Sequence, residues 1–183
     1  MGWRAAPGAL LVALALLDIV RAQDASPRPL RPEELRAGVI SKLPAYVEWP
    51  DDKLGAETNA LRLGVLTPAG RPDTVVALLT ELLKDSRVNG RPIEVAAFAQ
   101  PREAGGFHLV FVPDEVNAQW WDAVAAPDLR GLVTVGESGD FLRRGGVFRL
   151  LPERRRLQVN VRHAEQAGVK LNPRLLRICD VVR

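Results

Sequence analysis

The segment FHLVFVP, residues 107–113, decides the fold class that we expect for this chain. Its centre, Leu109 to Val112, is apolar at every position, which predicts a strand buried on both faces in the middle of a parallel sheet. Three further strands are predicted around it. Their sequences are ALRLGVLTP (60–68), RPIEVAAFA (91–99) and GLVTVGE (131–137).

Amphipathic helical patterns alternate with these strands. The first, at 32–49, should begin at Pro32, bend at Pro44 and end before Pro50. The others cover 71–85, with Asp73 as N-cap, and 114–126. A hairpin around PERR is expected at 146–161, followed by helices at 162–168 and 172–182.

This alternation predicts an α/β domain of three layers. The sheet should be mixed but mostly parallel, with five to six strands, helices on both faces and a C-terminal antiparallel hairpin. The connection 100–106 is short for a crossover between neighbouring parallel strands. A single helical turn is enough for this connection if the strands that it joins are not neighbours.

The first 22 residues have the pattern of a secretory signal peptide: a basic residue, a short apolar run and small residues at Val20 and Ala22. We expect cleavage before Gln23, a mobile Pro-rich leader at 23–33, and a single domain at 34–183. The apolar run is shorter than the ~20 residues of a membrane-spanning helix, so no transmembrane span is expected after cleavage.

Composition excludes several classes of protein. Loss of the leader's Arg4, Arg21 and Asp18 leaves 23 basic and 21 acidic residues, a balance too even for nucleic-acid binding. Cys179 is the only cysteine, so an internal disulfide cannot form. With two histidines far apart in the sequence, we predict neither a metal site nor a cofactor.

The Gly-rich turn after residue 135 does not match a catalytic motif. It lacks the Gly-Lys-Ser/Thr of a P-loop and the GxGxxG of a dinucleotide site, and GESGD differs from the GxSxG of a nucleophile elbow. A serine nucleophile would need His108 or His163 as its base. We expect a tight turn before a short helix that Gly145 closes, and no enzyme.

The same turn is the place where we predict a small ligand, if there is one. It follows the carboxyl end of a strand and leads into a helix N-terminus, which favours an anion or a metabolite. The residues of this predicted site are Gly136, Ser138, Gly139 and Asp140.

A protein partner is the other kind of ligand that we consider. Neighbouring tryptophans lie about 100° apart on a helix, so one of them can be partly exposed and anchor a partner; both could equally flank the buried stripe. An arginine run at the hairpin tip is either a solvated turn or a contact with an anionic partner or with lipid headgroups. The candidates are Trp49, Trp120, Trp121, Arg154, Arg155 and Arg156.

Several of these segments, in this order, resemble the YfiR-like family. The segment AGVISKLPAYVEWP is similar to its opening helix with a Trp-Pro end, and FHLVFVP to its central strand. The long C-terminal signature of the family is matched from LVTVGESGDF onward. Its positions here are Phe141, Gly145, Gly146, Asn160, Ala164, Ala167, Gly168, Leu175 and Leu176.

The resemblance implies a periplasmic regulator without catalytic activity. By analogy, the chain would bind the periplasmic part of a membrane-anchored diguanylate cyclase, or of a sensor kinase, and so affect cyclic-di-GMP signalling and biofilm formation. The resemblance also implies a homodimer. Disulfides occur in some members, but the single Cys179 leaves no partner for one within this chain.

Overall fold

The protein was analysed as a computed structural model, in which the chain divides into Met1–Leu30 and Arg31–Arg183. Every described helix and strand belongs to the second unit. The predicted signal peptide at 1–22 and the predicted leader up to residue 28 lie outside the described residues. Within the part of the chain that is described, no helix is both long enough and apolar enough to cross a membrane. The described ranges are 29–56, 59–68, 73–125, 129–154 and 156–182.

Strands and helices alternate through most of the chain, as the apolar patterns predict. The strands are β1 Val47–Glu48, β2 Leu61–Leu66, β3 Arg87–Val88, β4 Arg91–Phe98, β5 Leu109–Val112, β6 Val133–Gly136, β7 Phe148–Leu151, β8 Arg156–Asn160, β9 Lys170–Leu171 and β10 Asp180–Val182. The helices are α2 Pro32–Ile40, η1 Leu43–Tyr46, α3 Asp51–Leu54, α4 Thr74–Leu83, η2 Pro101–Gly106, η3 Asp114–Val116, α5 Asn117–Ala123, η5 Pro152–Arg154, α6 Val161–Gln166 and α7 Pro173–Leu176.

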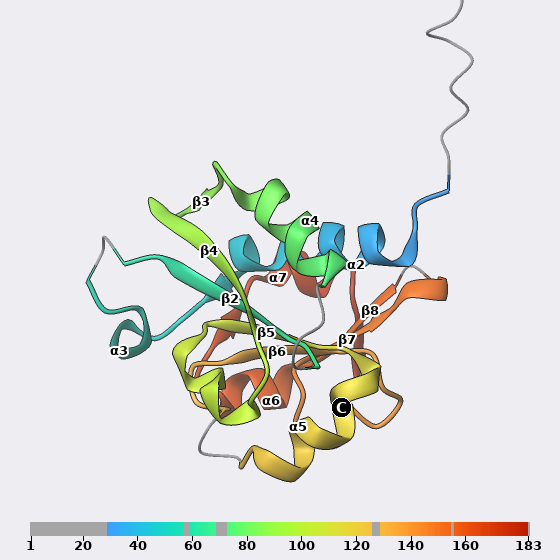
Figure 1. The fold of residues 1–183 in the computed structure, drawn as a ribbon. Coiled ribbons are helices and arrows are strands. Elements are labelled where there is room, and N and C mark those ends of the chain that lie inside the picture. Colours follow the sequence, from blue (N-terminus) through green and yellow to red (C-terminus); the bar gives the residue numbers. More distant parts are fainter. Residues whose placement is uncertain (1–28, 57–58, 69–72, 126–128, 155, 183) are drawn as a thin grey trace, which may run out of the picture. The chain divides into compact units, whose positions relative to one another are not determined.

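The main sheet has eight strands in the order β10-β8-β7-β6-β5-β2-β4-β3 (Figure 1). The five strands from β7 to β4 pair in parallel, whereas β7 and β8 form the predicted antiparallel hairpin. This confirms the α/β class and the mostly parallel mixed sheet. The sheet is larger than the five to six strands expected, because the short strands β3 and β10 extend its two edges.

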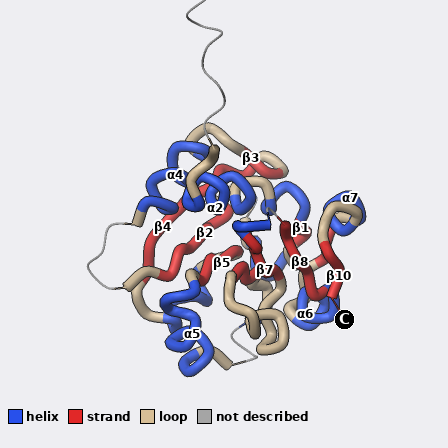
Figure 2. Tube along the Cα trace, turned by 90° about the vertical axis from the view of Figure 1, so that its right-hand side faces the viewer, coloured by secondary structure: helices blue, strands red, loops and turns tan. Residues whose placement is uncertain are grey.

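Helices cover both faces of the sheet (Figures 1 and 2). Alternate residues of β5 separate the two cores: Leu109 and Phe111 pack with buried residues of α2 and α4, while Val110 and Val112 pack with Trp120 of α5. All four β5 side chains are fully buried or nearly so. The apolar run that predicted a central strand therefore reflects two separate hydrophobic layers.

One local prediction is confirmed by contacts, and the strand order resolves the difficulty of the short connection 100–106. Asp73 is the N-cap of α4, and its Oδ1 accepts hydrogen bonds from the amides of Val75 (2.6 Å) and Val76 (3.1 Å). Strands β4 and β5 are not neighbours, because β2 lies between them. The short segment η2 is therefore enough to carry the chain from one to the other.

The long N-terminal helix predicted at 32–49 is wrong beyond Ile40. The chain continues as η1 and then as β1, which pairs with β9 through Val47 and Leu171. Pro44 lacks the amide that a continuing α-helix needs. The backbone of β1 forms its hydrogen bonds with β9, a segment far along the chain. Val47 therefore lies in a strand, although its spacing from the preceding apolar residues predicted a helix.

The closing helix predicted at 172–182 is also wrong in its second half. Helix α7 ends at Leu176, and Asp180 to Val182 form β10, which pairs in parallel with β8. The open edge of β8 offers these residues backbone hydrogen bonds, and Arg156 binds Asp180 at 2.9 Å across the pair. Cys179 lies just before β10 and is a free, half-buried thiol.

Candidate functional site

The parallel part of the sheet changes direction between β2 and β5. From β2 the chain first adds β4 on one side, and then returns to add β5, β6 and β7 on the other. In open α/β sheets, ligands bind outside the carboxyl ends of the strands at such a switch point. The sequence that follows each of these strands is therefore the first place to look for a site.

A cleft of about 570 Å³ lies at this switch point. It is walled by residues that follow β5 and β6, by the first residues of α4, and by one face of α2. Among the described residues, five carboxylates and one arginine line it, so the net charge of these residues is negative. The charged lining residues are Glu33, Arg36, Asp73, Asp114, Glu115 and Glu137.

The arginine of the cleft is held by two of its acids. Arg36 Nε donates to Glu137 Oε1 at 2.7 Å, and Arg36 Nη1 lies 3.7 Å from Glu33 Oε1. Burial works against the charge of Arg36, but the bond to Glu137 and the nearby acids outweigh it and raise the pKa of Arg36 further above its ordinary value. The guanidinium therefore stays charged.

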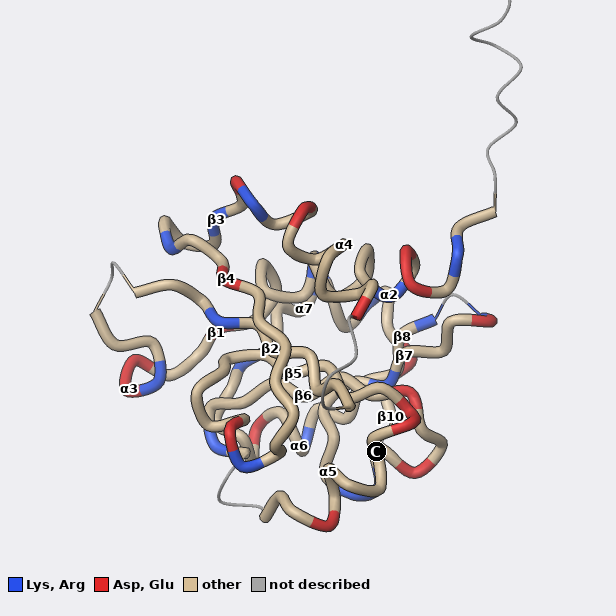
Figure 3. The backbone as a smooth tube through the Cα atoms, viewed as in Figure 1, with Lys and Arg blue, Asp and Glu red and all other residues tan. Residues whose placement is uncertain are grey.

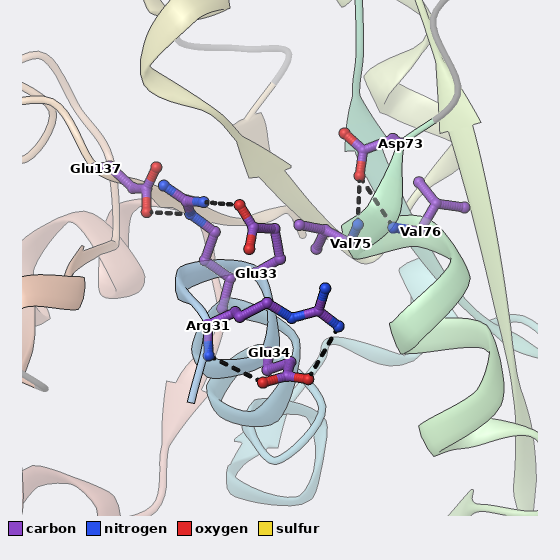
Figure 4. Close-up of polar contacts among 8 residues, drawn as sticks. Arg31, Glu33, Glu34, Asp73, Val75, Val76 and Glu137 are labelled. Carbon is purple, nitrogen blue, oxygen red and sulfur yellow. Dashed lines mark hydrogen bonds and ion pairs between the residues drawn. The ribbon is translucent and has the colours of Figure 1, made fainter. Parts of the chain in front are cut away.

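Two further acids in this region, Asp73 and Glu34, have local structural partners (Figure 4). Asp73 caps α4 through the amides of Val75 and Val76. Glu34 accepts from the Arg31 amide at 2.9 Å and from its guanidinium at 3.3 Å, which closes the first turn of α2. Acidic positions are visible at the start of α2 in Figure 3, while charges of both signs are spread over the rest of the molecule.

The chemistry of this cleft favours a positively charged group over an anion. The acids are too dispersed for a metal, since no cluster of three potential ligands occurs within the described residues. A basic side chain of another protein is a better match to such a surface. Neither Arg36 nor Glu137 was predicted from the sequence as a site residue. Glu137 could have been, because it lies at the carboxyl end of a predicted strand.

The Gly-rich turn is arranged around an aromatic ring. Gly136 and Gly146 both lie against Phe141, and a Cβ atom at either glycine would collide with that ring. Gly145 has a φ of 115°, which a side chain rarely adopts. In place of the predicted short helix there is a hydrogen-bonded turn, in which the Arg144 amide donates to Asp140 O at 3.1 Å. Packing against Phe141 thus explains Gly136 and Gly146, and the backbone conformation explains Gly145.

The polar side chains of the turn bind one another. Ser138 Oγ donates to Asp140 Oδ1 at 2.7 Å, and Asn117 Nδ2 donates to the same oxygen at 3.4 Å. The Ser138 bond is the main reason that the pKa of Asp140 is lowered. Gly139 is exposed. A charged carboxylate beside the acidic cleft does not favour an anion at Gly136–Asp140.

Each histidine has its own backbone partner. His108 is buried, its Nδ1 accepts from the Arg62 amide at 2.9 Å, and its Nε2 lies 3.3 Å from Lys53 O. An amide can only donate, so Nδ1 is unprotonated and Nε2 carries the hydrogen. His163 Nδ1 lies 3.1 Å from Gly146 O. Ser138 donates to Asp140, and so the pairing with a histidine that a serine nucleophile requires is not formed.

The tryptophan candidates differ in exposure. Trp49 is 7% exposed and Trp120 is fully buried, so neither is available as a surface anchor in this structure. Trp49 donates to His108 O at 3.1 Å. Trp121 is half-buried, and its Nε1 donates to Asn117 Oδ1 at 3.0 Å. Of the two neighbouring rings, Trp120 thus lies in the core and Trp121 at the edge of the buried face of the helix.

The hairpin tip carries the arginine run. Arg154 and Arg156 are exposed, and Arg156 is paired with Asp180. Arg155 lies outside the described residues. Arg154 and Arg156 are therefore at the surface, at the end of the β7–β8 hairpin.

The comparisons with known proteins agree with this architecture. A family model described as YfiR/HmsC-like matches residues 33–179. The chain belongs to the YfiR/HmsC-like family. The family consists of regulatory proteins rather than enzymes.

A solved structure shares the fold of this YfiR/HmsC-like protein. It is a conserved domain protein from Vibrio cholerae O1 biovar El Tor strain N16961, with a TM-score of 0.50 and 16% sequence identity. The match covers 84% of the present chain and 61% of that chain, so it supports the fold and nothing more. No curated protein matches the chain significantly.

Proposed function

We propose that this protein is a non-catalytic periplasmic regulator. It represses or modulates an inner-membrane signalling protein of the diguanylate cyclase type by binding that protein's periplasmic part. The observation that carries this proposal is the family match over residues 33–179. A sensor kinase is the alternative partner, and the homodimer implied by the resemblance stays a prediction.

Regulation of this kind requires only differential binding. A ligand shifts its partner between two states by the difference in its affinity for them, so the protein needs a surface and no reacting groups. The hairpin tip around Arg154 and the acidic cleft are two charged surfaces that the structure exposes. Of these two surfaces, only the hairpin tip carries residues that were predicted from the sequence to bind a partner.

The test is a measurement of cyclic-di-GMP in the native host. Deletion of the gene should change the cellular level, and the full chain should restore it. A version without residues 1–22 should not restore it, because it would remain in the cytoplasm. Restoration by the leaderless version, or an unchanged level after deletion, would contradict the proposal.

A second experiment addresses the contact surface. In a binding assay with the periplasmic domain of the cyclase, Arg154→Glu should weaken binding at least about tenfold if the hairpin tip contacts an acidic partner. Arg87→Glu is the matched control, because Arg87 is an exposed arginine on β3 at the other edge of the sheet. Equal effects of the two variants would exclude the hairpin tip.

An anion or metabolite bound at Gly136–Asp140 is the other function that the sequence suggested. The geometry gives it little support, since Ser138 and Asp140 bind each other and the adjoining cleft is acidic. We therefore keep the regulatory proposal as the main one.

A further inference from the structure

A second cavity, of about 590 Å³, lies on the other side of the Gly-rich turn. Its walls come from α5, from the turn, from β6 and from α6. The volume is within the range of roughly 300–1,000 Å³ that small-molecule sites occupy. The lining residues are Trp121, Val124, Leu129, Leu132, Thr134, Arg144, Gly145, Val147, His163, Gln166 and Ala167.

Among the described residues, apolar side chains form most of the cavity wall, and four polar side chains contribute to it. Thr134 is already engaged, because its Oγ1 accepts from the Val147 amide at 3.0 Å. Among the described lining residues, Arg144 and Gln166 remain as side chains that can donate a hydrogen bond to a ligand, and His163 contributes its ring. An apolar wall with a small number of donors is typical of a site for an amphipathic molecule.

His163 has one ring nitrogen left for a ligand. Its Nδ1 lies 3.1 Å from Gly146 O, and a carbonyl oxygen can only accept, so Nδ1 carries a hydrogen. Nε2 makes no hydrogen bond to another described residue, while the imidazole ring lines the cavity. In this tautomer Nε2 carries no hydrogen, so it can accept a hydrogen bond from a ligand donor but cannot donate one to a carboxylate.

The aromatic wall and the arginine are held in place by a closed set of contacts. Trp121 Nε1 donates to Asn117, Asn117 donates to Asp140, and Arg144 Nη1 lies 3.7 Å from Asp140 Oδ2. The Arg144 guanidinium in turn lies over the Trp121 ring, 5.5 Å from its centre. The polar residues of the turn, Ser138 and Asp140, thus position the cavity's side chains and need not bind a ligand themselves.

We propose that this cavity binds a small amphipathic carboxylate. The apolar body of the ligand would pack against Trp121, Leu132 and Val147, and its carboxylate would be bound by Arg144 and Gln166. Asp140 engages Arg144 only through Nη1 at 3.7 Å, and a guanidinium has five N–H donors, so several remain for the ligand. This proposal does not depend on the regulatory function proposed above.

An aromatic acid and a medium-chain fatty acid share this chemistry, and calorimetric titration of the purified chain separates them. The probes are 2-naphthoate, octanoate and the neutral 2-naphthalenemethanol. We expect at least one of the two acids to bind with a Kd of about 1 mM or tighter. Stronger binding of 2-naphthoate would identify a ring-bearing ligand, and stronger binding of octanoate an alkyl one.

The charge requirement is tested by the alcohol and by a pair of variants. The alcohol should bind at least about tenfold more weakly than 2-naphthoate, and Arg144→Gln should weaken the bound acid by a similar factor. Arg143→Gln is the matched control, because Arg143 is the neighbouring exposed arginine and does not line the cavity. Gln166→Ala provides a second variant in case Arg144→Gln lowers stability, and thermal unfolding verifies that each variant is folded.

Three outcomes would overturn the proposal. The first is that neither acid binds at millimolar concentration. The second is that the alcohol binds as tightly as 2-naphthoate, which would make the cavity a merely apolar one. The third is that the Arg143 and Arg144 variants weaken binding equally, which would show that only the overall charge matters.

Discussion

Arg36 of α2 and Glu137, the first residue after β6, are joined by a hydrogen-bonded ion pair of 2.7 Å across 101 positions of sequence. The Arg36 side chain is 26% exposed and that of Glu137 is 9% exposed, so water screens the pair only in part. This contact links the first helix of the fold to the carboxyl edge of the sheet, where the acidic cleft lies.

A double-mutant cycle with Arg36→Ala and Glu137→Ala should therefore give a coupling energy of about 1.5–3 kcal/mol in chemical unfolding, the range for hydrogen bonds to charged groups. The Arg130–Asp52 pair is a control, since its side chains are 77% and 63% exposed at 3.4 Å. Its coupling should be about 0–1 kcal/mol. Equal coupling in the two cycles would contradict the structural role of the Arg36–Glu137 pair.

Substitution of Gly136 tests whether the turn exists to accommodate Phe141. Gly136→Ala should lower the free energy of unfolding by about 1–3 kcal/mol, because the new methyl group meets the Phe141 ring. A methyl group added at Gly139 would have Arg149 Nη2 as its nearest neighbour at 3.7 Å, an ordinary contact. Gly139→Ala should change stability by less than about 0.5 kcal/mol. The packing explanation is wrong if the two variants are equally stable.

Arg91 connects the start of β4 to the segment after α3. It is 8% exposed, and its guanidinium donates to the backbone carbonyls of Leu54, Gly55, Ala56 and Asn59. A lysine cannot reproduce this fork, so Arg91→Lys should lower the free energy of unfolding by about 1–3 kcal/mol.

The control for Arg91 is Arg87→Lys. Arg87 is exposed and donates only to Gly90 O, at 3.3 Å, among its described contacts. Its replacement should change stability by less than about 0.5 kcal/mol in the same denaturant titration. A loss at Arg87 as large as that at Arg91 would show that the carbonyl contacts of Arg91 are not responsible.

His108 should make stability depend on pH. Burial lowers the pKa of His108 below its ordinary 6.5, although the bond to Lys53 O opposes this, and the charges of Lys53, Arg91 and Arg62 lower it further. Between the folded and unfolded pKa values only the unfolded chain binds the proton. Stability is therefore complete above pH 6.5 and falls as the pH falls toward the folded pKa.

Denaturant midpoints measured above and below pH 6.5 test this dependence. His108→Gln should be less stable than the natural chain above that pH, and its midpoint should fall less on acidification because the titrating group is gone. Titration of the carboxylates is common to both proteins and cancels in the comparison. An identical decrease in both proteins would show that His108 does not contribute.

Cys179 should be nearly unreactive at neutral pH. Burial, with a smaller effect of Asp180, raises the pKa of its thiol to about 11, and only the thiolate reacts. Labelling by a disulfide reagent at mildly alkaline pH should be about two orders of magnitude slower than for an unstructured cysteine peptide. Denatured protein should react at the peptide's rate, and equally fast labelling of the folded chain would refute the prediction.

Elements defined by contacts within a few residues were predictable. The apolar run of β5 indicated a central strand, and Asp73 was recognisable as the cap of α4 because its partners, Val75 and Val76, are its near neighbours. Helix and strand were mistaken where the backbone finds a distant partner, as in β1 with β9 and in β10 with β8. In both cases helical spacing was a poor guide, because pairing at a sheet edge requires only a few residues.

The candidate sites divide in the same way. The sequence predicted a ligand site at the turn Gly136–Asp140, and both the acidic cleft and the second cavity lie next to this turn. Neither Arg36 in the cleft nor His163 in the cavity was a predicted partner of that turn, because the contacts of each depend on the order of the strands.

By itself, the sequence determined the α/β class, the alternation of strands and helices, the Asp73 cap and the family resemblance. These depend on periodicity, hydrogen bonding and conformational preference over a few neighbouring residues. Only the tertiary structure decided that Arg36 meets Glu137, that Phe141 packs against two glycines, and that Trp121 and Arg144 share a cavity wall. Those contacts depend on strand order and packing, which bring together residues that no local pattern connects.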